Sequence, residues 1–274
     1  AHAAGHPFDG RSALDAVELM NVAANYMREH VKPDVRLHYS TIFNGAPNVV
    51  PDKCSVWYYI RAPKRKDVDE VYAWLCDCAK GAALMTQTSF DIEFLTGCSE
   101  VLPNDVLEQV MLAAYKDVGA PKFMPEDYAF AEKIAETYPE VLARDRKVMK
   151  EEYGVNGDDK FLCDVVFDKV IENRLVAPGS TDVGDVSHVV PTYQIYVAGQ
   201  GIGCPGHSWQ MTAYSGSHVG IASMLCAAKV LGLSGLRLLE QPELVEAAWD
   251  NFRQNQPEAY VSPLPEDLKP DLEG

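Results

Sequence analysis

Three catalytic patterns are absent from this sequence: the Gly-x-Ser-x-Gly of a nucleophile elbow, the His-Glu-x-x-His of a metalloprotease helix, and a phosphate-binding loop. Their absence counts against serine hydrolases, zinc proteases of that type and nucleotide hydrolases. Positive charge is also scarce, because 24 Lys and Arg stand against 40 Asp and Glu and leave a net charge of −16. A chain this acidic is repelled by phosphate backbones and anionic membrane surfaces, so we expect no nucleic-acid partner.

Long apolar runs are lacking as well. Charged residues interrupt the longest apolar stretches before they reach the roughly 18 residues that span a bilayer, so we expect no membrane insertion. The seven cysteines are odd in number and scattered, which favours reduced thiols and a cytoplasmic protein over a disulfide framework. Cys76 and Cys78 stand two apart on a predicted helix, where their side chains diverge, so we interpret them as structural thiols.

Apolar content is ample at 47%, enough for a sizeable core. Apolar residues recur at three- and four-residue spacing over 12–30 and 67–84, which predicts two amphipathic helices. Segments 35–43, 53–61 and 89–97 are β-rich or alternate in polarity and predict strands, the first two joined by a turn at 44–48. This α-β-β-α-β order predicts a compact two-layer α/β unit over residues 1–102.

Residues 103–274 are expected to form a second domain. A helix begins at Asp105 behind an Asn/Asp cap, and the charged, helix-rich segment from about 120 to 170 predicts a solvated helical insertion. A short strand at 193–198 and helices at 219–231 and 242–252 follow from the apolar periodicity.

Polar residues cluster with glycine and proline in three segments, 2–7, 179–185 and 204–210, and functional sites usually lie in such loops. His2 and His6 are four apart, but Gly5 and Pro7 argue against a helix, so the two need not share a metal. On residues alone, each isolated histidine is better explained as a hydrogen-bonded or solvated side chain. Segment 201–206 formally matches the dinucleotide-binding pattern, yet Pro205 and the polar stretch after it do not open a helix.

Two segments are specific enough to suggest a family. The opening His-Ala-Ala-Gly-His-Pro-Phe-Asp-Gly-Arg-Ser-Ala-Leu-Asp-Ala (2–16) and Ala-Pro-Asn-Val-Val-Pro-Asp (46–52), followed by a strand that ends at Arg61, are the residues concerned. They resemble the lid, or dimerisation, domain of the dinuclear-metal aminoacylase and glutamate carboxypeptidase family of amidohydrolases. Segments 179–187, 207–210 and 260–265 are similar to its aminobenzoyl-glutamate branch.

The resemblance assigns roles to three residues of the first domain. His2 matches the lid histidine that reaches the partner subunit's active site and stabilises a developing oxyanion, with His6 as the neighbour that could be confused with it. Asn48 and Arg61 match residues that hold the substrate's carboxylate, a task for which a planar guanidinium is well suited. The alternatives are a turn residue for Asn48 and a solvated strand end for Arg61.

Two more residues receive roles in the second domain. His207 matches the C-terminal histidine ligand of the dinuclear centre, and we favour it over His218. Asp182 stands where much of the family has a Glu-Asp-Phe segment, here replaced by Thr-Asp-Val, and it is expected to support the substrate site.

By resemblance, the complete enzyme is a homodimer through the lid that cleaves the amide bond of small N-acyl amino acids or dipeptides, such as p-aminobenzoyl-glutamate. Two divalent ions, zinc or manganese, would activate a bridging water. The family motifs that supply the other metal ligands and the general base precede the lid, and nothing in this sequence resembles them. We therefore expect the chain to be the C-terminal part of a longer enzyme whose true N-terminus lies upstream of Ala1. By resemblance, residues 103–274 would form the C-terminal part of its zinc-peptidase-like α/β catalytic domain. The alternatives are one half of a split enzyme and a non-catalytic dimerisation module.

Overall fold

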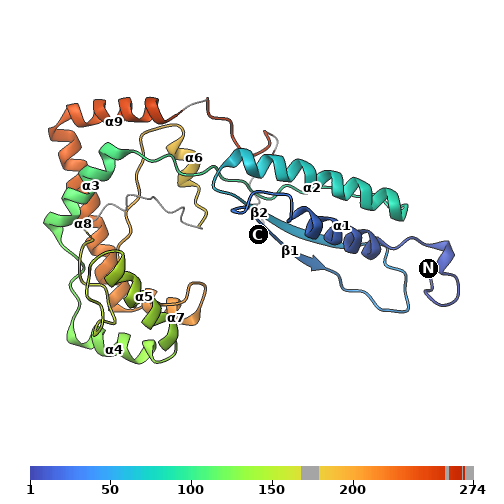
Figure 1. Cartoon of the computed structure of the whole chain (residues 1–274), viewed down its shortest axis with the longest axis horizontal. Helices are drawn as coiled ribbons and strands as arrows, with labels where there is room; N and C mark the ends of the chain where they lie inside the picture. The colour runs from blue at the N-terminus through green and yellow to red at the C-terminus, as the bar shows by residue number, and fades with distance from the viewer. Residues whose placement is uncertain (168–178, 257–258, 267, 269–274) are drawn as a thin grey trace. The chain divides into compact units, whose positions relative to one another are not determined.

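The computed structural model describes residues 1–167, 179–256, 259–266 and 268 (Figure 1). These residues form two compact units. Unit 1 comprises residues 1–101 with the described residues of 176–185 and 261–274, and unit 2 comprises the described residues of 102–175 and 186–260. The chain passes from unit 1 to unit 2 between Val101 and Leu102.

Unit 1 consists of two helices packed on a β-hairpin (Figure 1). Its order of helix, strand, strand and helix confirms the first four predicted elements. The bounds are α1 (Ala13–Met27), β1 (Arg36–Ile42), β2 (Ser55–Arg61) and α2 (Arg65–Thr86), with a short 3-10 turn, η1 (Pro7–Asp9), before α1.

The hairpin separates an apolar face from an exposed one because successive side chains of a strand point to opposite sides. Leu37 of β1 is buried against Met27 of α1 and Leu75 of α2, in one core cluster. On the other face Trp57 and Tyr59 are exposed, with their rings 5.5 Å apart. Burial of the apolar side chains therefore fixes which face of the hairpin the two helices cover.

The third predicted strand of this unit, at 89–97, is not formed, so that prediction was wrong. The sheet consists of β1 and β2 in the described part of the chain. Alternating polarity cannot make a strand without a neighbour that completes its backbone hydrogen bonds. The segment instead runs as irregular chain, with the Phe94 ring 6.0 Å from that of Tyr72 on α2.

The regular structure of unit 2 is helical in its described residues, apart from one isolated bridge between Leu162 and Gly201. The strand predicted at 193–198 is therefore another wrong prediction, since Ile195 and Val197 pack as irregular chain against a buried cluster that includes Ala114 and Val230. The helices are α3 (Asp105–Val118), α4 (Pro125–Ala135), α5 (Pro139–Glu151), α7 (Trp209–Ser215), α8 (His218–Glu240) and α9 (Pro242–Asn255), and the short α6 (Val183–Ser187) spans the division between the units.

The segment expected to be a solvated insertion contributes to the larger core of unit 2. Ile134 of α4 and Leu142 of α5 are buried in one cluster with Leu162 and Tyr214. Charged residues cover the outer faces of both helices, which explains why composition alone suggested a solvated segment. The helices were predicted correctly and their burial was not.

The glycine pattern at 201–206 serves this core. A Cβ at Gly201 would lie 2.3 Å from the Tyr214 hydroxyl, and one at Gly203 would lie 2.9 Å from the backbone of Leu142. Gly203 also has a left-handed φ of +73°, which suits glycine. These glycines are required for close packing, in agreement with the rejection of a dinucleotide site.

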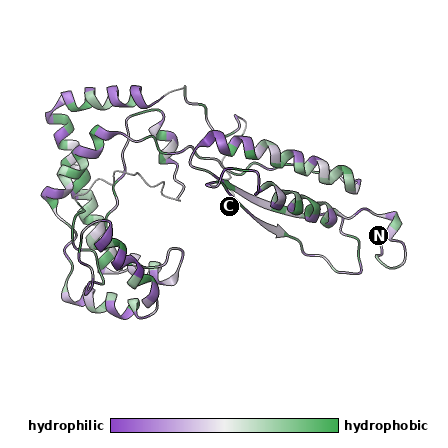
Figure 2. Ribbon diagram, in the orientation of Figure 1, coloured by the Kyte–Doolittle hydropathy of each residue, from purple (hydrophilic) through white to green (hydrophobic). Residues whose placement is uncertain are grey.

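Helix α8 is longer and more apolar than its sequence pattern predicts. It is long and apolar enough to cross a membrane by length and composition, although the core helix of a soluble protein passes the same test. Figure 2 shows apolar positions along most of its length. Met224 and Leu239 are exposed, whereas Val219 and Val230 are fully buried within unit 2. The helix therefore contributes one face to the core of unit 2 and leaves another apolar face uncovered.

Helix α2 receives its N-terminal cap from a distant carboxylate. Lys64, at the N-cap position, makes no side-chain cap, and Glu100 instead accepts a hydrogen bond from the Arg65 N–H at 2.9 Å and pairs with Lys64 at 3.3 Å. Partial burial alone would raise the pKa of the Glu100 carboxyl, but these donors outweigh it and hold that pKa below its ordinary value. The ionised form of Glu100 is thus the one that stabilises the helix.

We expect Glu100→Gln to lower the free energy of unfolding by about 1 kcal/mol near pH 7, as loss of a helix cap does. The contribution of a carboxyl with a depressed folded-state pKa is present above its unfolded pKa and is lost as the pH falls through the folded value. Urea titrations of both proteins from neutral pH down to about pH 3 should therefore converge. Glu93→Gln, an exposed change in the same segment, is the control. A gap that persists in acid would contradict this account.

Candidate active site

His2 and Asn48 lie side by side at the tip of unit 1. The chain start pairs with the hairpin loop, because His2 and Val49 form an antiparallel bridge and the Ala3 N–H donates to the Asn48 carbonyl at 3.0 Å. Both side chains are exposed. The structure therefore brings together two of the predicted site residues, which are 46 positions apart in the sequence.

The His2 ring is oriented by its own loop. Its Nδ1 accepts hydrogen bonds from the backbone N–H groups of Ala4 and Gly5, at 3.2 and 3.0 Å. A nitrogen that accepts carries no proton, so neutral His2 holds its proton on Nε2. That Nε2–H is a positioned donor of the kind that stabilises an oxyanion. His6 contacts Phe8 edge-on at 5.7 Å, so its ring packs on a neighbour.

Arg61 lies at the opposite end of the hairpin from this tip. It ends β2 and faces Arg36 across the sheet, whereas the loop that carries Asn48 leaves from Ile42 and returns at Ser55. Six strand steps of about 3.3 Å separate Ser55 from Arg61, so the two ends are about 20 Å apart. Arg61 and Asn48 of one chain therefore cannot hold the same carboxylate. The Arg61 guanidinium lies 5.7 Å from the Tyr59 ring centre, a cation–π distance.

Asp182 is exposed and immediately precedes α6. Its backbone carbonyl accepts from the Asp185 N–H at 3.1 Å, and the Thr181 hydroxyl accepts from the Val183 N–H at 3.3 Å. These contacts shape the turn into α6 and leave the Asp182 carboxylate on the surface. The motif at 179–185 pointed to this turn, where the contacts of Asp182 are local and structural.

Sequence reasoning missed the residues of the same segment that make its long-range contacts. The Asp185 carboxylate accepts from the Ser99 N–H at 3.2 Å, and the buried Ser187 hydroxyl accepts from the Leu102 N–H at 2.8 Å. Gly184 packs so tightly that an added Cβ would lie 2.0 Å from the Ser99 carbonyl oxygen. The motif at 179–187 drew attention to this segment in the sequence. A motif does not indicate which residue it contacts 86 positions away.

His207 lies in the loop before α7, exposed and with a left-handed φ of 53°. Ser208 caps α7 by accepting from the Met211 N–H at 3.3 Å and donates to the Pro205 carbonyl at 2.7 Å. Positive φ is uncommon for a residue with a side chain, and such strain concentrates at functional positions. His207 therefore carries a backbone signature that the sequence did not show.

His218, the rival for the metal-ligand role, is engaged with a carboxylate. Its Nδ1 lies 2.7 Å from Oδ2 of Asp127, a buried residue that also accepts from the Met124 N–H and caps α4. Such a carboxylate orients an imidazole, as in many metal sites. The partners are 91 positions apart, which is why no local pattern in the sequence revealed the pair.

The described residues do not fit a metal centre by themselves. Among them no group of three or more His, Cys, Asp or Glu side chains is placed to hold an ion. A catalytic metal generally needs at least three protein ligands. A groove of about 340 Å³ in unit 1 and a hollow of about 240 Å³ in unit 2 are lined by none of the five predicted site residues.

The chain is similar to known proteins over nearly its whole length. No protein-family model matches the chain. It is 34% identical to a subunit of the p-aminobenzoyl-glutamate hydrolase of Escherichia coli (strain K12), across 98% of this chain and 58% of that subunit. It is 28% identical to the Xaa-Arg dipeptidases of Mus musculus and Homo sapiens, across 92% and 96% of this chain and 48% and 50% of theirs. The chain spans about half the length of these relatives.

We expect Gly184→Ala to destabilise the chain by about 1–3 kcal/mol, because the new methyl overlaps a backbone carbonyl that cannot move away as a side chain could. Gly179→Ala is the matched control, since nothing lies within 4 Å of its Cβ position in the same motif. Thermal unfolding of both variants measures the effect. Equal melting temperatures for the two variants would contradict the tight packing of α6.

Proposed function

We propose that the chain is a member of the amidohydrolase family of these relatives and the C-terminal part of an enzyme that cleaves the amide bond of N-acyl amino acids. p-Aminobenzoyl-glutamate is the proposed substrate, and related acyl amino acids or dipeptides belong to the same class. The observation that carries this proposal is the 34% identity to the E. coli p-aminobenzoyl-glutamate hydrolase subunit across 98% of the chain.

The chain's own residues would bind and polarise the substrate. Arg61 would hold the carboxylate of the amino-acid part with its guanidinium, which presents paired N–H donors in a plane. His2 would donate its Nε2–H to the carbonyl oxygen as negative charge develops there, supported by the loop that fixes its ring. Asn48 lies beside His2 and would contact the substrate at the same end as His2, the end that carries the carbonyl oxygen.

One active site that uses all three residues needs two chains. His2 and Asn48 lie at one end of the hairpin and Arg61 at the other, about 20 Å away. A homodimer would let the tip of one chain reach the Arg61 end of its partner, and a two-fold axis would make two equal sites. The separation within one chain is the physical support for the proposed dimer.

His207 is proposed as a metal ligand, and Asp182 is proposed as a carboxylate that supports the substrate site. A bound zinc or manganese pair would lower the pKa of an attacking water when present. The described residues do not complete such a centre, so its remaining ligands would come from residues outside those described or from another polypeptide. A split enzyme completed by a second chain is the alternative that this incomplete ligand set favours.

The free thiols support the proposed cytoplasmic location. All seven cysteines are unpaired, and Cys226 is buried. Burial raises the pKa of the Cys226 thiol, which keeps it protonated and unreactive.

The decisive experiment compares the chain alone with the chain supplied with the part of the E. coli hydrolase subunit that it does not match. Bound metal per chain and release of p-aminobenzoate are measured in both samples. We expect metal binding and hydrolysis only in the combined sample. Hydrolysis by the isolated chain with stoichiometric metal would contradict the incomplete site. A stable dimer without activity in either sample would instead favour a dimerisation module.

The two-chain site makes a sharper prediction in the combined sample. His2→Ala should lower kcat by about 10²–10³, the usual effect of removing one oxyanion donor. Mixing His2→Ala chains with Arg61→Ala chains should restore about a quarter of the wild-type activity, because half of the dimers are mixed and each has one intact site. Mixing His2→Ala with Asn48→Ala is the matched control and should restore nothing, since both changes affect the same tip. Equal recovery in both mixtures, or in neither, would overturn the arrangement.

A further inference from the structure

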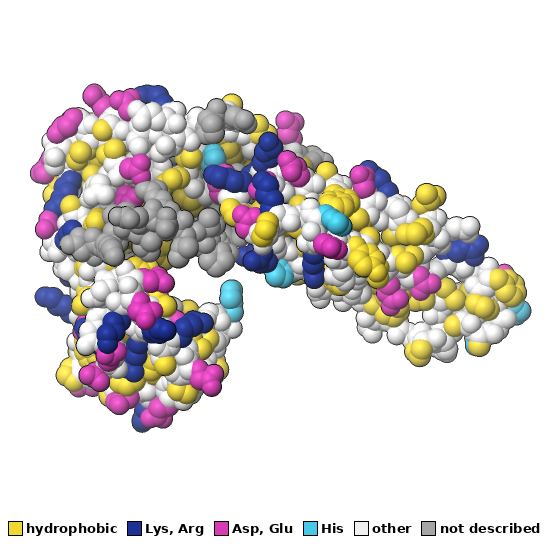
Figure 3. All heavy atoms as spheres, in the orientation of Figure 1, with side chains coloured by type: hydrophobic (Ala, Val, Ile, Leu, Met, Phe, Trp, Pro, Cys, Tyr) yellow, Lys and Arg dark blue, Asp and Glu magenta, His cyan; other side chains and the backbone are white. Residues whose placement is uncertain are grey.

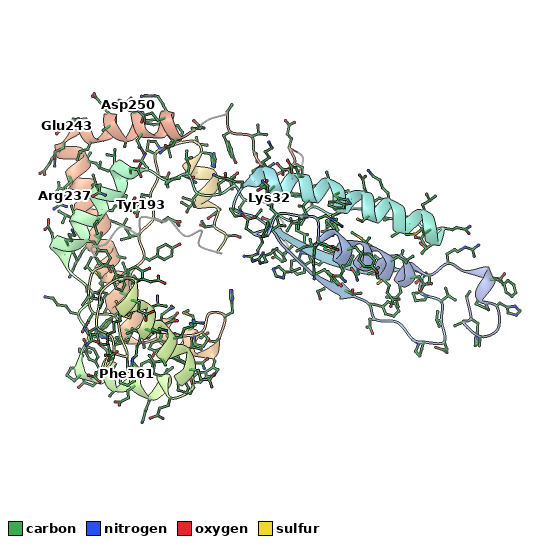
Figure 4. All side chains as sticks on the ribbon, in the orientation of Figure 1. Lys32, Phe161, Tyr193, Arg237, Glu243 and Asp250 are labelled. Carbon is green, nitrogen blue, oxygen red and sulfur yellow. The ribbon has the colours of Figure 1, made fainter. Side chains whose placement is uncertain are left out.

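A groove of about 340 Å³ in unit 1 lies between the end of α1, the turn that follows it and the start of β1. Four of its ten lining residues are basic: Arg28, Lys32, Arg36 and His38. None is acidic, although the chain has 40 acidic residues against 24 basic ones. Figure 3 shows Lys and Arg side chains gathered at this end of the hairpin, and Figure 4 labels Lys32 there.

Two guanidinium groups in the groove keep their charge. Arg28 donates Nη2–H to the Leu37 carbonyl at 2.7 Å, and Arg36 donates Nη1–H to the carbonyls of Pro33 and Val35 at 2.5 and 2.9 Å. Within the described residues neither makes an ion pair with a carboxylate. Carbonyl oxygens fix the side chains without neutralising them, and each guanidinium has further N–H donors.

Lys32 contributes less to the charge of the groove. Its ammonium pairs with the buried Asp67 at 2.5 Å, and the nearby Asp34 and Glu70 also act on it. The uncompensated positive charge of the groove therefore comes from Arg28 and Arg36.

Apolar side chains make up the rest of the lining: Met27, Val31, Val35, Leu37 and Val71, together with Pro33. Met27, Val35, Leu37 and Val71 are buried. An apolar wall lowers the local dielectric constant and strengthens charge interactions beside it. The volume is at the lower end of that of small-molecule sites, and an apolar floor with a few fixed polar groups is typical of them.

We propose that this groove is a binding site for a small, multiply charged oxyanion, held by Arg28 and Arg36 and resting on the apolar floor. Phosphate and a short dicarboxylate share the required chemistry, because both present paired oxygens to a guanidinium. The proposal is independent of the proposed hydrolase activity, since none of the groove residues has a role in that site and no metal or partner is needed.

The test is calorimetric titration of the full 274-residue chain with inorganic phosphate and, separately, with glutarate, at constant ionic strength. We expect saturable one-to-one binding of at least one of the two, and their relative affinities identify the preferred oxyanion. Replacing both arginines, Arg28→Gln with Arg36→Gln, should weaken binding at least about tenfold, because two charge-assisted contacts are lost. Lys80→Gln, which removes an exposed charge from α2 of the same unit, should leave binding unchanged.

Two controls keep the outcome decisive. Circular dichroism and thermal melting without ligand show whether the double variant folds. If it does not, Arg36→Lys keeps the charge but loses the planar fork, and it should still weaken binding several-fold. Equal affinity in wild type, arginine variants and Lys80→Gln would mean an adventitious ion only and would overturn the site. Absence of saturable binding of both anions to the wild type would overturn it as well.

Discussion

Buried backbone N–H groups must find acceptors, and this requirement shapes the connection between α2 and α3. The N–H of Ser99 is satisfied by the Asp185 carboxylate, and that of Leu102 by the Ser187 hydroxyl. Both acceptors come from one segment more than 80 positions later, which reaches Ser99 closely because Gly184 has no side chain. Glu100, between these residues, caps α2. Residues 99–102 therefore determine both how α2 begins and where α6 lies.

The two ends of the hairpin carry different polar groups. One end carries a histidine with a fixed tautomer beside an asparagine, and the other carries guanidinium groups on both strands. In a chain with a net charge of −16, positive groups collected at one end create a local potential opposite to that of the whole molecule. Anions, whether substrate or ligand, would therefore meet an attractive end of an otherwise repelling protein.

Local periodicity was sufficient to predict α1, α2, β1, β2 and α3, because each is decided by neighbouring residues and a cap such as Ser12 or Asn104. It failed at 89–97 and 193–198, where the pattern of a strand is present but no described partner completes it. The same limit applies to the predicted site residues. Motifs indicated His2, Asn48 and His207, yet the tautomer of His2, the positive φ of His207 and the Asp127–His218 pair depend on tertiary contacts that no local pattern encodes.

The length of the hairpin affects the spacing of its polar groups as well as its stability. Since side chains alternate along a strand, adding two residues to each strand would leave every side chain on its original face and the core unchanged. The same change would move the tip away from Arg61 by about 7 Å. A chain altered in this way would keep its fold, yet in the proposed dimer its two polar ends would no longer match the spacing of the partner chain. Strand length therefore sets the distance between the two polar ends of the hairpin. Selection can change that distance while the fold stays the same.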